Sequence, residues 1–217
     1  MWRALTSDRS GFGRVYGSAA VFDPAVTPFG AVDESSGRAA WDDLRTLLGP
    51  GGQTVLFCEP VELAAGWQVT HRIPCVQMIA TGVAGGTDPR LVPLGRDDVS
   101  DMLDLIAETR PGPFGPRTVE LGGYRGLRLE GRLVAMAGER LRCDGFTEIS
   151  AVCTSAPVRG QGLGTALVQS VVADIRARGE EPFLHASASN ETAIRLYLDL
   201  GFEVRRTLEA TAVQAPA

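Results

Sequence analysis

The stretch VRGQGLGTALV, Val158–Val168, places glycine at three alternate positions and then becomes apolar. Glycines spaced in this way let the backbone approach a ligand closely and turn several N–H groups in one direction. Leu163, Leu167, Val171 and Ile175 recur every four residues, which predicts an amphipathic helix directly after the turn. Because the positive end of that helix faces the turn, the stretch predicts a site for a phosphate or pyrophosphate.

Two familiar phosphate-binding patterns do not fit this turn. A P-loop needs Gly-Lys-Ser/Thr, and the chain contains no lysine, since all 21 of its basic residues are arginine. The dinucleotide pattern GxGxxG is not met, because its last glycine is missing here. That pattern also requires an acidic residue at the end of the next strand, whereas Glu180 and Glu181 stand before the next predicted strand. The pattern that remains is Arg/Gln-x-x-Gly-x-Gly/Ala, which Arg159, Gly162 and Gly164 satisfy.

The flanks of the turn give this short pattern its specificity. TEISAVCT, Thr147–Thr154, predicts a strand before the turn, and PFLHAS, Pro182–Ser187, predicts another after the helix. Asn190 is placed to cap a second helix that Gly201 closes. The segment FEVRRTLEA, 202–210, predicts a last strand. The order is therefore strand, glycine turn, helix, strand, helix, strand.

Composition excludes several classes of function. The chain of 217 residues is 44% hydrophobic and 22% charged, which is typical of a globular protein. A net charge of −5 gives no basic field for nucleic acid, and no apolar run is long enough to span a membrane. The four cysteines stand singly, so we expect no metal site. Nothing at the start of the sequence resembles a signal peptide, and these features together predict a cytoplasmic protein.

The region before residue 90 is harder to interpret. Residues 1–35 show little sustained period, a helix is predicted over Gly37–Leu48, and a linker is predicted over Thr81–Pro89. Outside the segments already named, strands are predicted at 54–58, 67–73, 75–79 and 90–94, a helix begins at Asp97 or Asp98, and a hairpin turns at Leu129–Arg132.

The arrangement over roughly residues 90–210 resembles the GNAT superfamily of acyl-CoA-dependent N-acetyltransferases. EISAVCTSAPVRGQG, Glu148–Gly162, and FLHASASNETAIRLYLDLGF, Phe183–Phe202, are particularly similar to its glycine-N-acyltransferase-like branch. The resemblance implies an α+β fold with a mixed central sheet flanked by helices. It implies an N-terminal α/β region over 1–88 that is a smaller, degenerate GNAT-like half, a GNAT domain over 89–210, and a flexible tail over 211–217.

The resemblance also implies a site for acetyl-CoA or another acyl-CoA, bound as a cosubstrate. Its pyrophosphate would lie on the N–H groups of the glycine turn, at the helix N-terminus. Its pantetheine arm would pair with the preceding strand like an extra strand. Asn190 would cap its own helix and contact the cosubstrate. The residues expected to bind are Val152, Cys153, Thr154, Arg159, Gly160, Gln161, Gly162, Leu163, Gly164, Thr165 and Asn190.

Two catalytic residues follow from the same resemblance. Tyr197 would lie beside the departing sulfur and donate a proton or a hydrogen bond to it. Glu148 would be the base that takes the proton of the amine, directly or through water. Strand alternation puts Glu148, Ser150 and Val152 on one face, in a half-buried cleft that would raise the proton affinity of the carboxylate. His185, on the neighbouring strand, could be the base instead or orient the substrate.

The predicted function is acyl transfer to a primary amine of a small molecule or amino acid, by direct attack within a ternary complex. Two alternatives are a GNAT-like module that binds acyl-CoA as a sensor without catalysis, and a structural module that serves only for dimerisation. A homodimer is compatible with each of these. The resemblance does not identify the acceptor amine.

Overall fold

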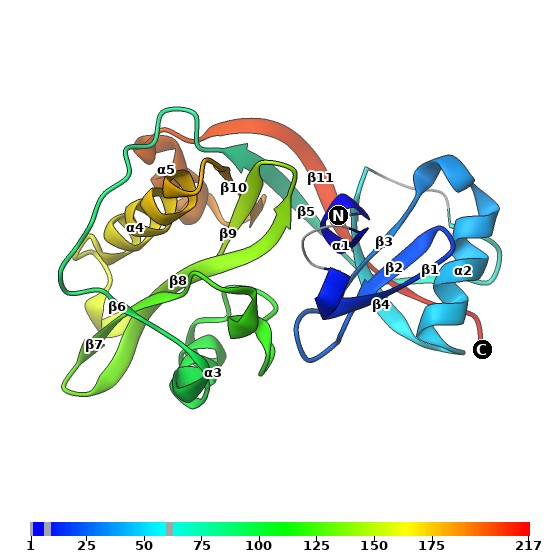
Figure 1. The fold of residues 1–217 in the computed structure, drawn as a ribbon, viewed down its shortest axis with the longest axis horizontal. Helices are drawn as coiled ribbons and strands as arrows, with labels where there is room; N and C mark the ends of the chain where they lie inside the picture. Colours follow the sequence, from blue (N-terminus) through cyan, green and yellow to red (C-terminus); the bar gives the residue numbers. More distant parts are fainter. Residues whose placement is uncertain (1, 7–9, 60–62) are drawn as a thin grey trace.

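The computed structural model describes residues 2–6, 10–59 and 63–217, and its strands form one mixed sheet (Figure 1). The strands are β1 (Gly13–Tyr16), β2 (Ala19–Phe22), β3 (Phe29–Val32), β4 (Gln53–Cys58), β5 (Gln68–Ile79), β6 (Val92–Pro93), β7 (Arg125–Leu129), β8 (Arg132–Cys143), β9 (Phe146–Thr154), β10 (Glu181–Ser187) and β11 (Glu203–Gln214). The α-helices are α1 (Trp2–Thr6), α2 (Arg38–Leu48), α3 (Val99–Thr109), α4 (Leu163–Ala177) and α5 (Glu191–Leu200). Short 3-10 turns lie at Ser10–Phe12, Glu34–Ser36, Arg96–Asp98, Thr118–Leu121 and Ala156–Val158.

The sheet contains the same strand–helix–strand unit twice. Its order is β1-β2-β3-β4-β11-β5-β10-β9-β8-β7-β6. β3 and β4 are parallel and are joined through α2, and β9 and β10 are parallel and are joined through α4. The predicted GNAT fold, a mixed sheet flanked by helices, is therefore present, and the N-terminal half repeats part of its topology.

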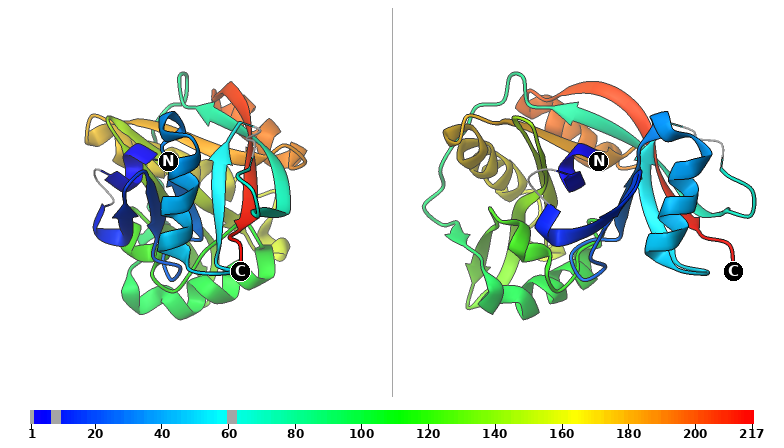
Figure 2. Two further views of the ribbon diagram at one scale, coloured as in Figure 1. Left: turned by 90° about the vertical axis from the view of Figure 1, so that its right-hand side faces the viewer. Right: turned by 45° about the vertical axis from the view of Figure 1, so that its right-hand side comes forward.

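The two long strands β5 and β11 interleave the halves. β5 comes from the N-terminal half, yet it lies between β10 and β11. β11 comes from the C-terminal half, yet it lies between β5 and β4. Figures 1 and 2 show both strands arching from one lobe of the molecule to the other. The predicted boundary near residue 88 falls in the connection after β5, but the sheet runs across both halves.

Helices cover both faces of the C-terminal half. α4 and α5 pack on one face, where Leu167, Val171 and Ile175 of α4 are fully buried, as their spacing predicts. α3 packs on the other face, with Met102 and Leu105 buried against β8. The short helix α1 covers the junction between the halves, where Ala4 and Leu5 pack in one cluster with residues of both halves. Within the described residues, no helix combines the length and apolarity needed to cross a membrane.

One sequence prediction was wrong, and the strands of the first 35 residues were missed. The expected flexible tail, 211–217, is wrong because β11 continues to Gln214, and Val213 and Ala215 are buried against the N-terminal half. The N-terminal strands were missed because each has only four residues and β2 is buried on both faces, which removes the alternation of apolar and polar residues. Beyond Pro74, β5 continues as one strand, as the sequence suggests.

Candidate active site

The glycine turn has the backbone of an anion site. Gly160 and Gly162 have φ angles of 77° and 75°, a region that only glycine enters without strain. A Cβ at either position would meet nothing within 4 Å, so the backbone faces open space. The N–H groups from Gly160 to Thr165 donate to no residue that the structure describes, and they lie at the N-terminus of α4. Unpaired N–H groups at the positive end of a long helix fit a pyrophosphate.

A split between two parallel strands begins beside this turn. β9 and β10 pair from Glu181 with Phe146 up to Leu184 with Ile149, and no later pair is present among the described residues. Beyond Ile149, the edge of β9 that faced β10 is therefore open. This edge includes Val152, Cys153 and Thr154. Its backbone groups could therefore pair with the extended, amide-bearing pantetheine arm of acyl-CoA.

A bulge in β9 changes which side chains share a face. Cys153 pairs with Met136 and Ser150 with Gly138, so β9 carries one residue more than β8 between these pairs. Ala151, with φ 53°, lies at the bulge. Val152 consequently packs with Ile149 against α4 and α5, which is the face opposite to Glu148. The expectation that Glu148 and Val152 share a face is therefore wrong, because simple alternation ignores the extra residue.

Tyr197 lies on α5 at the face of the sheet that α4 also covers. Its ring packs edge-on against Phe202, and its side chain is buried in the core under α4 and α5. Burial, with a smaller contribution from the nearby Cys153 thiol, raises the pKa of Tyr197 to about 12. Because this pKa lies far above neutral, the hydroxyl stays protonated, and it makes no hydrogen bond to a described residue. Asn190 caps α5 as predicted, accepting the N–H of Ala193 at 3.1 Å.

Glu148 is fully buried and is bound on both oxygens. Arg140 donates Nε–H to Oε2 at 2.9 Å and Nη2–H to Oε1 at 2.7 Å. His185 Nδ1 lies 2.8 Å from Oε1. Burial by itself raises the pKa of Glu148, but the Arg140 guanidinium and then His185 outweigh it and hold this pKa well below its usual range. The expected half-buried cleft with a raised proton affinity is therefore wrong.

His185 connects this buried pair to an open pocket. Its Nε2 lies 3.0 Å from Nε2 of Gln77, whose Oε1 accepts from Nη1 of Arg205 at 2.9 Å. Because Arg205 can only donate, the carboxamide must present its oxygen to Arg205 and its NH₂ to the imidazole. His185 then accepts at Nε2 and donates Nδ1–H to Glu148. This network assigns His185 as the neutral Nδ1–H tautomer.

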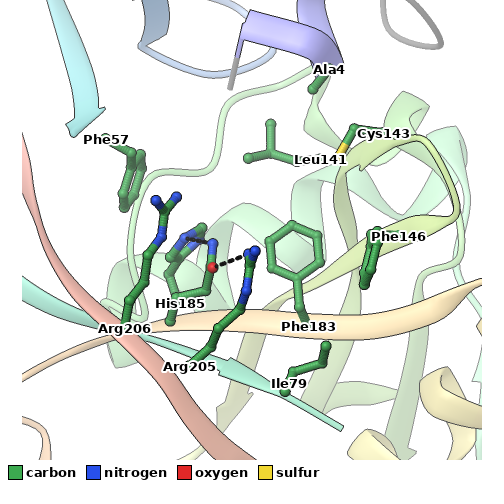
Figure 3. Close-up of a pocket in the computed structure, with 11 residues that line it drawn as sticks. Ala4, Phe57, Ile79, Leu141, Cys143, Phe146, Phe183, His185, Arg205 and Arg206 are labelled. Atoms are coloured by element: carbon green, nitrogen blue, oxygen red, sulfur yellow. Dashed lines mark hydrogen bonds between the residues drawn. The ribbon is translucent and has the colours of Figure 1, made fainter. Parts of the chain in front are cut away.

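The pocket has a volume of about 160 Å³ and lies where the two halves meet (Figure 3). His185 stands in its wall with its ring stacked on Phe57, the ring centroids being 4.7 Å apart. It is also the next residue of β10 after the last pair with β9, so the pocket reaches the start of the split. The other lining residues are Ala4, Gln77, Ile79, Leu141, Cys143, Phe146, Phe183, Arg205 and Arg206.

Most of the predicted site residues therefore lie around the split between β9 and β10, whereas Glu148 lies apart from it. The residues from Val152 to Thr165 lie along the split and the turn, and Tyr197 lies on the α4 and α5 side. Glu148 lies behind His185, with no exposed surface of its own. Nowhere in the described ranges do His, Cys, Asp and Glu side chains form a group of three or more that could hold a metal ion.

Sequence reasoning missed Arg140, Gln77 and the Arg205–Arg206 pair. Arg140 stacks on an aromatic ring, its guanidinium carbon 4.7 Å from the centroid of Phe29. An arginine within the apolar run of β8 was a usable signal for a buried ion pair. The other residues carry no spacing pattern, because β5 and β11 are brought to β10 only by the tertiary fold.

Comparison with known proteins agrees with this geometry. The family described as FR47-like protein matches residues 124–211. A presumed acetyltransferase of the GNAT family from Novosphingobium aromaticivorans DSM 12444 is 40% identical, with a TM-score of 0.90 over 100% of this chain and 96% of that one.

Two less similar structures share the fold alone. A GCN5-related N-acetyltransferase from Kribbella flavida is 18% identical, with a TM-score of 0.59 over 100% of this chain and 96% of that one. One from Sphaerobacter thermophilus is 16% identical, with a TM-score of 0.54 over 91% and 76%. No curated protein matches the chain. Given the 40% identity over the whole length, the protein belongs to the GNAT family of acetyltransferases.

Proposed function

We propose that the protein transfers an acetyl or other short acyl group from acyl-CoA to a primary amine of a small molecule or amino acid, within a ternary complex. We also propose that it belongs to the glycine-N-acyltransferase-like branch of its family. The observation that supports this best is the run of unpaired N–H groups from Gly160 to Thr165 beside the open edge of β9. Such a site suits a pyrophosphate with an extended amide-bearing arm.

The residues of the turn and of β9 would hold the cosubstrate. The N–H groups of the turn would bind the pyrophosphate, and Val152–Thr154 would pair with the arm. Arg159 already donates Nε–H to the Thr154 carbonyl at 3.1 Å, which ties the turn to the end of the strand. When bound, the thioester supplies the acyl group and a thiolate as leaving group. All other chemistry falls to side chains of this chain.

His185 is the group that would take the proton of the amine. The amine of the acceptor would displace the Gln77 amide from Nε2, and Nε2 would accept the proton as the amine attacks. Nδ1–H would keep its hydrogen bond to Glu148, whose negative charge stabilises the imidazolium. Glu148 would thus position His185 and would not touch the substrate, which is the second of the two assignments left open by the sequence.

Tyr197 would act as a hydrogen-bond donor to the leaving sulfur. Its pKa of about 12 lies above the ordinary pKa of a thiol, about 8.5, so complete transfer of its proton to a thiolate is uphill. A hydrogen bond from a phenol to a developing thiolate still lowers the energy of the charged state. The hydroxyl would therefore stabilise the thiolate while remaining protonated.

Gly162→Val should weaken acetyl-CoA binding by about tenfold or more, which corresponds to about 1.4 kcal/mol. Valine strains a backbone with φ 75° and covers the N–H groups that the pyrophosphate needs. Titration calorimetry measures the change. Gly179→Val is a matched control, because Gly179 has φ 76° and open space at the other end of the same helix. Equal affinities of the two variants would show that the turn is only structural, and the proposed function would fail.

Tyr197→Phe should lower kcat by roughly 10- to 10²-fold, the value of one hydrogen bond to a charged group. The phenyl ring keeps the packing against Phe202, so the free energy of unfolding and the affinity for acetyl-CoA should change little. Thiol release from acetyl-CoA in the presence of an amine measures the rate. Full activity in this variant would make Tyr197 a core aromatic, with water stabilising the thiolate instead.

A further inference from the structure

A bulge in β11 directs two consecutive arginines into the pocket. Val204 pairs with Met78 and Arg206 with Gln77, so Arg205 is the extra residue between them. A bulge places neighbouring side chains on the same side of a strand, which ordinary alternation forbids. Arg205 and Arg206 both line the pocket, and Figure 3 shows both guanidinium groups projecting from β11 toward it.

Among the residues that the structure describes, the pocket carries positive charge with no acid to compensate it. Neither Arg205 nor Arg206 forms an ion pair with a described residue. None of the described residues that line the pocket is acidic, and the nearby Glu148 is buried and paired with Arg140. His185 is neutral in the network described above. An occupant with a negative group would supply the missing charge, and two adjacent guanidinium groups suit a carboxylate.

The Gln77 carboxamide shows what the pocket can bind beside His185. Its oxygen accepts from Arg205 and its NH₂ faces Nε2 of His185, at 2.9 and 3.0 Å. One small planar group thus spans the two side chains. An α-amino acid carries its carboxylate and its amine on the same carbon, so it presents an acceptor and an N–H donor at a similar separation. It could bind Arg205 with one end and His185 with the other.

We propose that the acceptor is an α-amino acid with an apolar side chain, bound through its carboxylate by Arg205 and Arg206. Its amine would then lie at His185, next to the split. The side chain would pack against the apolar part of the wall, formed by Phe57, Ile79, Leu141, Phe146 and Phe183. This inference rests on the proposed acyl transfer and names its acceptor, and it assigns Arg205 and Arg206 as the residues that determine specificity.

The test compares acceptors that differ only in the carboxylate. Phenylalanine and leucine, their decarboxylated amines phenethylamine and isoamylamine, and glycine are assayed by thiol release from acetyl-CoA. We expect kcat/KM for the amino acids to exceed that for the decarboxylated amines by about tenfold or more, which is the value of a hydrogen-bonded charge pair. Glycine should be poorer than phenylalanine, because it leaves the apolar wall unused.

The matched variants are Arg205→Met and Arg206→Met, with Arg38→Met as control. Arg38 is exposed on α2, outside the pocket. Each pocket variant should lower kcat/KM for phenylalanine by about tenfold more than kcat/KM for phenethylamine, and Arg205→Lys should recover part of the loss. Equal losses for both acceptors, or phenethylamine as the better acceptor in the wild type, would overturn the proposal.

Binding without turnover separates this proposal from the proposed function. Calorimetric titration of the wild type with phenylalanine, in the absence of acetyl-CoA, should show binding that Arg205→Met weakens and Arg38→Met does not. If acetyl-CoA binds and phenethylamine reacts, but phenylalanine neither binds nor reacts, the acceptor assignment is wrong and acyl transfer stands. If acetyl-CoA itself does not bind, the proposed function fails, whatever the pocket holds.

Discussion

Replacing His185 with glutamine should lower kcat by roughly 10³-fold, within the range that general-base catalysis contributes. Glutamine keeps a polar group of similar length at the pocket wall but cannot accept a proton at neutral pH. Affinity for acetyl-CoA should be unchanged, because His185 lies outside the glycine turn. Raising the pH should partly restore the rate, since more of the amine then arrives without its extra proton. Thiol release over a range of pH, with calorimetry for acetyl-CoA, measures both effects.

Glu148→Gln is the informative comparison. Its amide oxygen can still accept the Nδ1–H of His185, but the charge that stabilises an imidazolium is lost. We expect a kcat lowered by roughly 10- to 10²-fold, a smaller loss than that of His185→Gln. The reverse order, with His185→Gln active and Glu148→Gln inactive, would return the role of base to Glu148, as the sequence first indicated.

Arg140→Met should reduce the free energy of unfolding by about 3–5 kcal/mol, because it leaves a buried carboxylate without its cation. Both partners are removed from water, with 8% of the Arg140 side chain and 0% of the Glu148 side chain exposed. The variant also loses the guanidinium that stacks on Phe29, so the contact between the two halves weakens. Urea unfolding followed by circular dichroism measures the change.

Adding Glu148→Gln to Arg140→Met is the control. It removes the unpaired charge and keeps an acceptor for His185, so most of the loss should be recovered. Acid dependence gives a second readout. Since the pKa of Glu148 is lowered on folding, its contribution is present above the pKa of an unfolded glutamate, about 4.3, and is lost as the pH falls below it. The double variant should lose less stability over that range than the wild type. A double variant no more stable than Arg140→Met would mean that packing, and not charge, dominates.

The sequence predicts the C-terminal half well because its signals are local. The glycine turn, the spacing of Leu163 and Leu167, and the Asn190 cap each act within one turn of chain, and the structure confirms all of these elements. The run of N–H groups at the start of α4 could likewise be predicted, since it consists of consecutive backbone groups. Its role in binding acyl-CoA stays a prediction.

The pocket beside His185 could not be predicted because it depends on irregularities and on distant strands. The bulge at Ala151 reverses the faces of β9, and the bulge at Arg205 aligns two arginines, and neither has a sequence signal that simple alternation detects. Gln77 reaches His185 only because β5 is inserted beside β10. The lowered pKa of Glu148 could not be predicted for the same reason, since it depends on Arg140 of the adjacent strand rather than on its own neighbours in sequence.

The interleaving of β5 and β11 has a consequence for how the chain folds during synthesis. β4 takes β11 as its partner, and β11 leaves the ribosome after the other strands of this sheet, while β5 must wait for β10 and β11. The first half therefore cannot complete its core before the second half exists, and its unpaired strand edges stay exposed for most of translation. Pairings this distant in sequence are slow to form and vulnerable to aggregation. A cell that produces this protein in quantity should depend on chaperones that shield β4 and β5 until β11 arrives.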